Sequence, residues 1–389
     1  MIGVFFARVL WFKSCKAYHL ERLTMTSIPK RRFLNSINYF RGIAIIIIVM
    51  THSYGIAHWN VYRDASLFEK VFYSFNLNGS VFFVFISGYL YHHIFFPNFN
   101  YQKFLTKKAK FVLTPYLICS ALPIIYTVFD RQNEWLFNIF FDSGGIEFLP
   151  IGLQDKPLWS ILWFIVTGRA VYAYWFIPMV IVIFLIAPLV NYLIRTQHLL
   201  KVILFLIPIS MIVHRPLHNM NPLHSLIYFL PVYLLGIYSS INRQKIIAYL
   251  KSDRYKLIIL SLAILLCLIQ VLFFDVSGNF SKSFFSITVL DINIIQKILL
   301  CFLFISVLDN LEKAEINSLK QTAQTSFAIY FIHPFLLRPL TRLSKVWGNF
   351  EGNLLTLFIA TLLVVIISIA IAHLIKLVFN KNSRYIIGW

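Results

Sequence analysis

The sequence predicts an all-α, polytopic membrane protein with about ten transmembrane helices and both termini in the cytoplasm. Of its 389 residues, 59% are hydrophobic and only 13% are charged, and the mean hydropathy is +0.74, far above that of an ordinary soluble chain. The net charge of +20 is spread over short polar segments between long apolar runs. This distribution argues against nucleic acid as a partner and favours anionic lipid headgroups and a phosphate-bearing ligand.

The first 36 residues form a basic leader ahead of the transmembrane domain. Met1 to Phe12 is an apolar run that is too short to cross a bilayer and lacks a suitably placed small-residue cleavage site. Either this run lies on the membrane surface, or translation starts at Met25, which opens a compact leader of its own. We expect the transmembrane domain over residues 37–379 and a cytoplasmic tail over residues 380–389.

Ten apolar runs are predicted to span the membrane, and the first extends from Ile37 to Ala57. The stretch from Pro157 to Thr167 is too short and is predicted to be re-entrant or interfacial. Lysine and arginine gather in the loops that are cytoplasmic when the amino terminus is inside, which predicts a multi-pass protein of the plasma (inner) membrane in that orientation. The nine later spans are predicted at residues 71–96, 111–129, 172–194, 199–213, 223–240, 255–274, 292–308, 325–340 and 354–379.

An arginine and a histidine share the first predicted span. His52 lies eleven positions after Arg41, which at about 100° per residue is three turns plus about 20°, so both side chains share one face roughly 16 Å apart. An ionisable side chain at that depth is costly, which makes His52 a candidate functional residue. A neutral imidazole can take a proton from an attacking hydroxyl or accept an acyl group itself. Both routes stay open, as does a structural histidine that bonds a neighbouring helix.

A basic residue separated by ten others from a histidine, in the first full span, resembles the membrane acyltransferase 3 family. Further stretches similar to this family follow in its order from about Asn38 to Phe379. The family moves acyl groups, most often acetyl, from acyl-coenzyme A to sugars and other envelope acceptors. The resemblance implies that His52 is the catalytic residue and that Arg41 binds the phosphates of acetyl-coenzyme A. The alternative for Arg41 is an ordinary anchor at the cytoplasmic end of a span.

Two more segments resemble motifs of the family. Lys107 and Lys110 stand three apart ahead of Pro115, where the family usually has arginines, and one helical face would present both to phosphate. Binding of anionic lipid at the membrane edge is the alternative. Ser87 and Gly88 resemble the family's phenylalanine-rich SG motif, for which we expect close helix packing, with contact between Ser87 and the pantetheine arm as the alternative.

Three aromatic or histidine residues are further pocket candidates. Trp175 lies in a stretch similar to the family's WF segment, where it either contacts a ligand or belongs to the outer aromatic belt. Many family members have a histidine where this chain has Ala173, which weakens inference about the acceptor site. Tyr330 and His333 are three residues apart on one face of a late span, which resembles the family's late histidine-containing span.

A metal site is not predicted. His214, His218 and His224 crowd one outer loop at irregular spacings with no acidic or cysteine ligand beside them, so we expect a solvated loop. The four cysteines show neither disulfide nor zinc spacing.

The sequence therefore predicts an O-acyltransferase that uses cytoplasmic acyl-coenzyme A, most often acetyl-coenzyme A, and a glycan acceptor of the envelope. The rival class is a transporter or flippase that exports a glycan or lipid-linked sugar without chemistry, since internal ionisable groups and prolines suit both. The basic cytoplasmic segment on the same side as Arg41 favours the enzyme. A structural membrane subunit is a third alternative.

Overall fold

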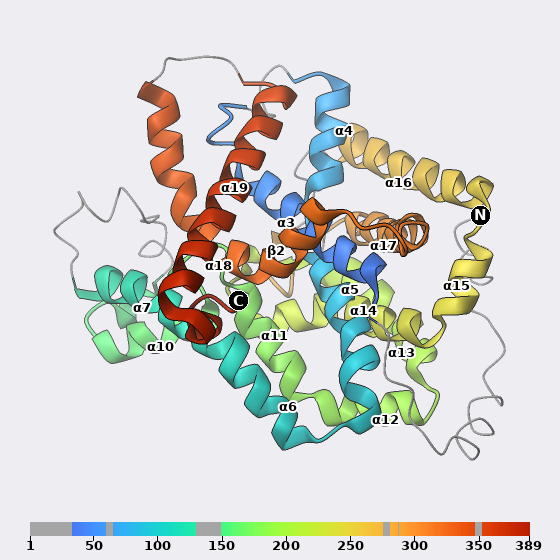
Figure 1. The fold of residues 1–389 in the computed structure, drawn as a ribbon, viewed down its shortest axis with the longest axis horizontal. Helices are drawn as coiled ribbons and strands as arrows, with labels where there is room; N and C mark the ends of the chain where they lie inside the picture. The colour runs from blue at the N-terminus through green and yellow to red at the C-terminus, as the bar shows by residue number, and fades with distance from the viewer. Residues whose placement is uncertain (1–32, 60–64, 130–148, 275–280, 287, 347–351) are drawn as a thin grey trace.

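The structure is a computed structural model that describes residues 33–59, 65–129, 149–274, 281–286, 288–346 and 352–389. The leader up to residue 32 lies outside the described residues, so both interpretations of it stay predictions. Helices dominate the fold, as predicted (Figure 1). Their bounds are α3 (Asn35–His52), α4 (Leu67–Asn76), α5 (Ser80–Leu90), α6 (Tyr101–Lys108), α7 (Thr114–Phe129), α10 (Pro157–Thr167), α11 (Phe176–Leu185), α12 (Ala187–Arg195), α13 (Leu199–Val213), α14 (Pro222–Ile241), α15 (Arg243–Tyr249), α16 (Asp253–Phe273), α17 (Asn293–Asp309), α18 (Asn317–Val346), α19 (Leu354–Phe379) and α20 (Ser383–Ile386).

Among the described residues, five helical stretches are long and apolar enough to cross a membrane. The count rises to six if α11 and α12, which meet at a 55° bend, form one broken span. A helical membrane protein is therefore confirmed, whereas the count of ten spans is not. The five stretches are Leu67–Asn98, Tyr101–Phe129, Pro222–Ile241, Asp253–Phe273 and Leu354–Ile386.

The first predicted span ends earlier than expected. Helix α3 stops at His52 instead of continuing to Ala57, because the backbone N–H of Ser53 bonds Met50 and its hydroxyl donates to the carbonyl of Val49 at 2.8 Å. The chain then turns back on itself. His52 is thus the last residue of the helix, and α3 packs chiefly on α18.

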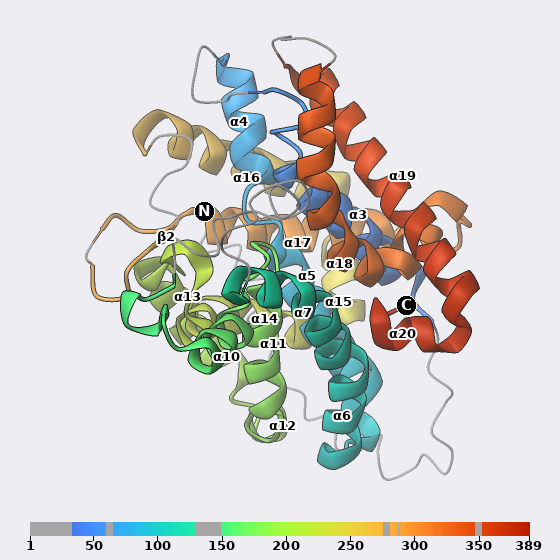
Figure 2. The same cartoon turned by 90° about the vertical axis from the view of Figure 1, so that its left-hand side faces the viewer.

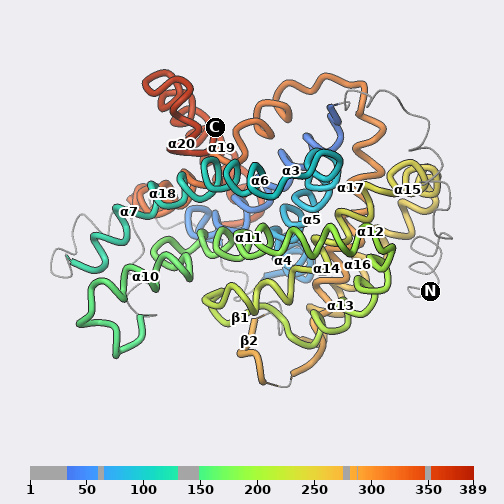
Figure 3. Tube along the Cα trace, turned by 90° about the horizontal axis from the view of Figure 1, so that it is seen from below, coloured from blue at the N-terminus to red at the C-terminus, as the bar shows by residue number. Residues whose placement is uncertain are grey.

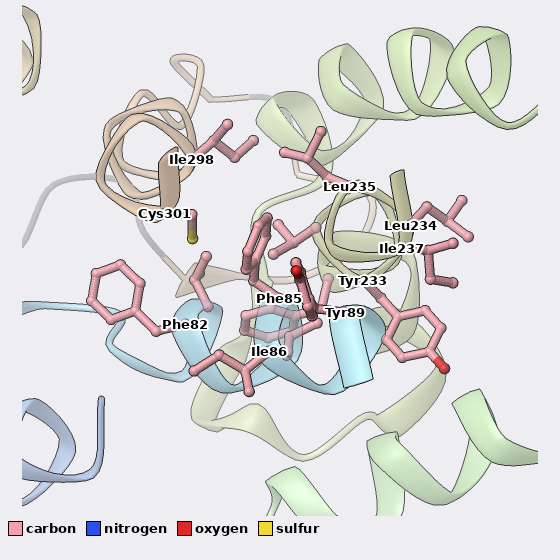
Figure 4. Close-up of a cluster of buried hydrophobic side chains, with 14 of the residues drawn as sticks. Phe82, Phe85, Ile86, Tyr89, Tyr233, Leu234, Leu235, Ile237, Ile298 and Cys301 are labelled. Atoms are coloured by element: carbon pink, nitrogen blue, oxygen red, sulfur yellow. The ribbon is translucent and has the colours of Figure 1, made fainter. Parts of the chain in front are cut away.

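Helices α5 and α14 cross in close contact, and both contribute side chains to the buried hydrophobic cluster drawn in Figure 4. A Cβ added to Gly88 would lie 1.9 Å from the carbonyl oxygen of Tyr233, and one added to Gly236 would lie 2.0 Å from that of Phe85. The two backbones therefore touch without intervening side chains. The close packing expected around the SG motif is confirmed.

The second predicted span is broken between α4 and α5. Asn78, which lies between the two helices, has a positive φ of 60°, a conformation that the short polar side chain of asparagine tolerates better than most. Lys297 of α17 is fully buried and donates to the carbonyl of Phe75 in the last turn of α4. A cation placed there satisfies a carbonyl at the negative end of the helix dipole.

Two loops meet beside α14 in a short parallel pair of strands (Figure 3). Strand β1 (Arg215–Pro216) pairs with β2 (Ser281–Lys282), with Arg215 opposite Ser281. This pairing fixes the backbone of the loop that carries Arg215.

The predicted tail at residues 380–389 folds back onto the helices (Figure 2). Helix α20 packs on α7, with the guanidinium of Arg384 3.9 Å from the centre of the Phe111 ring. The thiol of Cys119 donates to the carbonyl of Ile386 at 3.3 Å.

Candidate functional site

Two histidines from distant parts of the chain stack at the end of α3. The rings of His52 and His333 are 5.6 Å apart and 28° from parallel, and the ring of Tyr172 meets His52 edge-on at 4.9 Å. The three side chains come from α3, α18 and the turn before α11. The structure therefore brings together two residues that the sequence places 281 positions apart.

His333 has a defined proton arrangement. Its side chain is fully buried, and Nδ1 donates to the carbonyl of Ile329 at 2.9 Å. Because a carbonyl only accepts, a neutral ring must carry its proton on Nδ1 and a lone pair on Nε2. Nε2 is buried and has no hydrogen-bond partner among the described residues. This nitrogen can accept a proton from a bound hydroxyl.

Two tyrosines fasten the turn before α11 to α18. Tyr330 donates to the carbonyl of Ala173 at 2.8 Å, and Tyr174 donates to the carbonyl of Phe331 at 2.6 Å. Their hydroxyls are thus engaged by backbone. The hydrogen bond from Tyr330 to Ala173 joins α18, which carries His333, to the turn that carries Tyr172. It therefore fixes the positions of these two side chains relative to each other.

Trp175 is buried and not part of a lipid-facing belt. Only 7% of its side chain is exposed, and its ring stacks on Phe229 at 5.8 Å and 25°. The interpretation of Trp175 as an outer-belt residue is therefore wrong. The ring is held between Phe229 of α14 and the guanidinium of Arg215.

Arg215 is a site residue that sequence reasoning missed. Its guanidinium is 6% exposed and lies 4.8 Å from the centre of the Trp175 ring. It donates to the side-chain oxygens of Asn78 at 3.3 Å and Asn219 at 2.7 Å, and it is near enough to interact electrostatically with His52. Burial lowers the pKa of Arg215 to about 10, so the group remains charged at neutral pH. A lone arginine in an outer loop carries no periodic signal, which is why the sequence did not reveal it.

Arg41 lies on the same uninterrupted helix as His52, as the spacing required. It is half-buried, donates to the side-chain oxygen of Asn38 at 3.0 Å, and has a buried Nε without a partner among the described residues. His52 is the last residue of α3, and Arg41 lies eleven residues earlier, in the second turn of the helix. The binding of phosphate by Arg41 stays a prediction.

The lysines before α7 divide into two kinds. Lys107 and Lys110 are exposed, whereas Lys108 points inward, 4.5 Å from the centre of the Phe184 ring and 4.9 Å from that of Phe95. A π-helical turn, Ala109–Leu113, begins between the two exposed lysines. Its wider turn changes the angle between their side chains from the one expected of an α-helix.

Ser87 is half-buried in α5 and is not among the residues that contact the His52 ring. Its neighbour Gly88 makes the α14 contact described above. A contact between Ser87 and the pantetheine arm stays a prediction.

The histidine-rich loop is only partly solvated, because His218 is exposed as expected whereas His214 and His224 are buried. His214 is fully buried with its Nε2 2.7 Å from the carbonyl of Val289, and His224 is buried with its Nε2 3.1 Å from the carbonyl of Val213. Burial lowers the pKa of His214 to about 4, so a neutral ring donates to Val289. Within the described residues, no group of three His, Cys, Asp or Glu side chains could hold a metal ion. These histidines tie loops together.

These features define a multi-span helical membrane protein with an imidazole pair beside a buried guanidinium. A family model described as an acyltransferase domain, acyltransferase 3, matches residues 34–373. The chain belongs to this acyltransferase family, and it is a membrane acyltransferase. No curated protein and no solved structure matches the chain.

Proposed function

We propose that the chain is an O-acyltransferase of the plasma (inner) membrane that moves an acyl group, acetyl in the simplest case, from cytoplasmic acyl-coenzyme A to a hydroxyl of an envelope or exopolysaccharide glycan. The observation that carries this proposal is the stacked pair of His52 and His333, in which a buried imidazole nitrogen has an unused lone pair. Transfer to a hydroxyl needs such a base, and the family supplies the acyl chemistry.

The imidazole pair supports two routes. In direct transfer, His52 takes the hydroxyl proton as the acceptor oxygen attacks the thioester carbon, and later returns that proton to the departing thiolate. In the covalent route, His52 attacks the thioester first and carries the acyl group to the acceptor. His52 is the proposed catalytic residue in both routes, and stacking on His333 fixes the plane of its ring.

The donor is proposed to bind from the cytoplasmic end of the helices. Arg41, Lys107 and Lys110 would bind the phosphates of coenzyme A, and the pantetheine arm would pass Ser87 on its way to His52. The exposure of the two lysines and the half-buried position of Arg41 support this assignment. It requires the orientation with ten spans and cytoplasmic termini that the charge pattern favours, and anionic lipid headgroups compete for the same lysines.

The test measures thiol release from acetyl-coenzyme A by the purified protein in detergent, with candidate glycans present. We expect His52→Ala to lower the rate at least about 100-fold, because general-base catalysis contributes 10²–10⁴. His198→Ala is the matched control, since this histidine is exposed at the start of α13 and should leave the rate unchanged. A folded His52→Ala protein with full turnover would refute the mechanism.

Transport of a glycan or lipid-linked sugar without chemistry is the second candidate. The break between α4 and α5, with buried Lys297 at its edge, is the kind of discontinuous helix that transporters use for binding. The same assay separates the two, because a transporter would move labelled sugar across vesicles and release no thiol. Membership of an acyltransferase family favours the enzyme.

A further inference from the structure

We infer that Arg215 is a catalytic residue of the proposed acyl transfer: its guanidinium stabilises the negative charge that forms on the thioester carbonyl oxygen when the nucleophile attacks. The inference rests on the proposed function. It assigns a role to a residue that lies within the matched residues 34–373 but in none of the short motifs named above.

A first structural bridge joins Arg215 to His52 through the break between α4 and α5. Thr51, the neighbour of His52, donates to the carbonyl of Asn76 at 3.4 Å. Two residues further on, the side-chain oxygen of Asn78 accepts from Arg215. The end of α3 and the guanidinium are thus attached to the same short turn.

A second bridge runs through the turn before α11. Tyr172 contacts the ring of His52 at 4.9 Å, and Trp175, three residues later, lies beneath the guanidinium of Arg215 at 4.8 Å. Since both bridges are only a few residues long, Arg215 and His52 line the same part of the interior. Their electrostatic interaction agrees with this placement.

The surroundings of Arg215 fix its orientation through two amide side chains and an aromatic ring. The amide oxygens of Asn78 and Asn219 receive two of its donors, and Trp175 supports its face. The carboxylate of Asp291 joins the network one step away, because Asn78 donates to Tyr228 and Tyr228 donates to Asp291 at 2.8 Å. A fixed cation in a water-poor interior interacts more strongly with a new charge than one in water.

The chemical step needs such a cation. The acceptor oxygen forms a bond to the carbonyl carbon while an imidazole takes its proton, and the C=O π electrons move onto oxygen. That oxyanion is the charge that Arg215 stabilises. When the C=O bond re-forms, the C–S bond breaks, and the thiolate takes the proton from the imidazolium to leave as free coenzyme A.

The test compares kcat and KM of the full chain in detergent with acetyl-coenzyme A and an accepted glycan. We expect Arg215→Gln to lower kcat about 10²–10³-fold with both KM values nearly unchanged, because removal of one oxyanion donor has that effect. Arg215→Lys, which keeps the charge, should be intermediate, and methylguanidinium should restore part of the activity of Arg215→Ala. Arg254→Gln is the matched control, since Arg254 is exposed at the start of α16.

A structural role for Arg215 would lower thermal stability and give no rescue by methylguanidinium, and a role in binding an acidic acceptor would raise the KM for the glycan with kcat retained. Either outcome overturns the inference, as does a fully active Arg215→Gln. If Arg215→Gln does not fold, Asn219→Ala removes one orienting bond and should lower kcat about fivefold at unchanged KM; an unchanged kcat refutes the inference. If the wild-type protein turns over acetyl-coenzyme A and Arg215→Gln is equally active, only the role of Arg215 is refuted. If the wild-type protein shows no turnover, the proposed function is refuted as well.

Discussion

Asp291 is a buried carboxyl group next to the proposed site. Its Oδ1 accepts the backbone N–H of Asn293 at 2.9 Å, and its Oδ2 accepts the hydroxyl of Tyr228 at 2.8 Å. Burial raises the pKa of Asp291 to about 6, against the opposite effects of these bonds and of Arg215. The folded protein therefore holds this proton more tightly than the unfolded chain does.

This shift predicts a pH-dependent stability. The pKa of Asp291 is higher in the folded protein than in the unfolded chain, where it is near 4. Below pH 4 this group therefore adds about 3 kcal/mol to the free energy of unfolding, and that contribution is lost as the pH rises to about 6. Asp291→Asn should remove the dependence, so the difference in Tm between wild type and variant should fall from pH 4 to 6 and then level off. Thermal unfolding in detergent across pH 4–8 measures this. A flat difference would contradict the prediction.

Sequence reasoning at this scale found residues that belong to motifs and missed those that depend on tertiary contacts. The spacing of Arg41 and His52 and the late histidine His333 were readable, because each lies within a regular helix. Arg215 and Asp291 come from loops, where neither period nor composition signals burial. The buried ring of Trp175 was misassigned for the same reason, since aromatic residues near span ends are common in both settings.

At the scale of elements, the crossing of α5 and α14 predicts that replacing Gly88 by alanine, the smallest possible side chain, destabilises the protein. Gly88→Ala would place a Cβ 1.9 Å from the Tyr233 carbonyl, so the helices must separate, at a cost of about 1–3 kcal/mol. We expect a lower Tm and lower activity together. Gly152→Ala is the control, because nothing lies within 4 Å of the added atom. Equal stability of the two variants in thermal unfolding would show that the helices cross less closely.

Element boundaries were partly predictable. The bounds of α10, Pro157–Thr167, match the short apolar stretch, since a proline opens it and Gly168, with φ of 71°, ends it. The end of α3 was not predictable, because the residues after His52 are apolar enough to continue a span. The helix ends there because of local hydrogen bonds made by Ser53, which the sequence pattern does not reveal. At the end of α4, the carbonyl of Phe75 is bonded by Lys297, which lies more than 200 positions away and could not be assigned there from the sequence.

At the scale of the whole molecule, the proposed orientation predicts which ends face the cytoplasm. Helix α6 lies at one end of the molecule, and the last turn of α18 and the first turn of α19 lie at the other (Figure 1). In a cysteine-free background, Lys345→Cys should react with an impermeant thiol reagent on intact cells, whereas Lys103→Cys should react only after permeabilisation, since both positions are exposed. The reverse pattern would invert the topology and place the proposed donor site on the wrong side.

The close backbone approach of α5 and α14, where Gly88 faces the Tyr233 carbonyl and Gly236 faces that of Phe85, also limits how the molecule can open. Two helices whose backbones touch with no side chains between them cannot slide or tilt independently. We therefore expect α5 and α14 to move together as one rigid body. An entry path for a bulky donor or sugar must then open by movement of the neighbouring helices away from the α5–α14 pair.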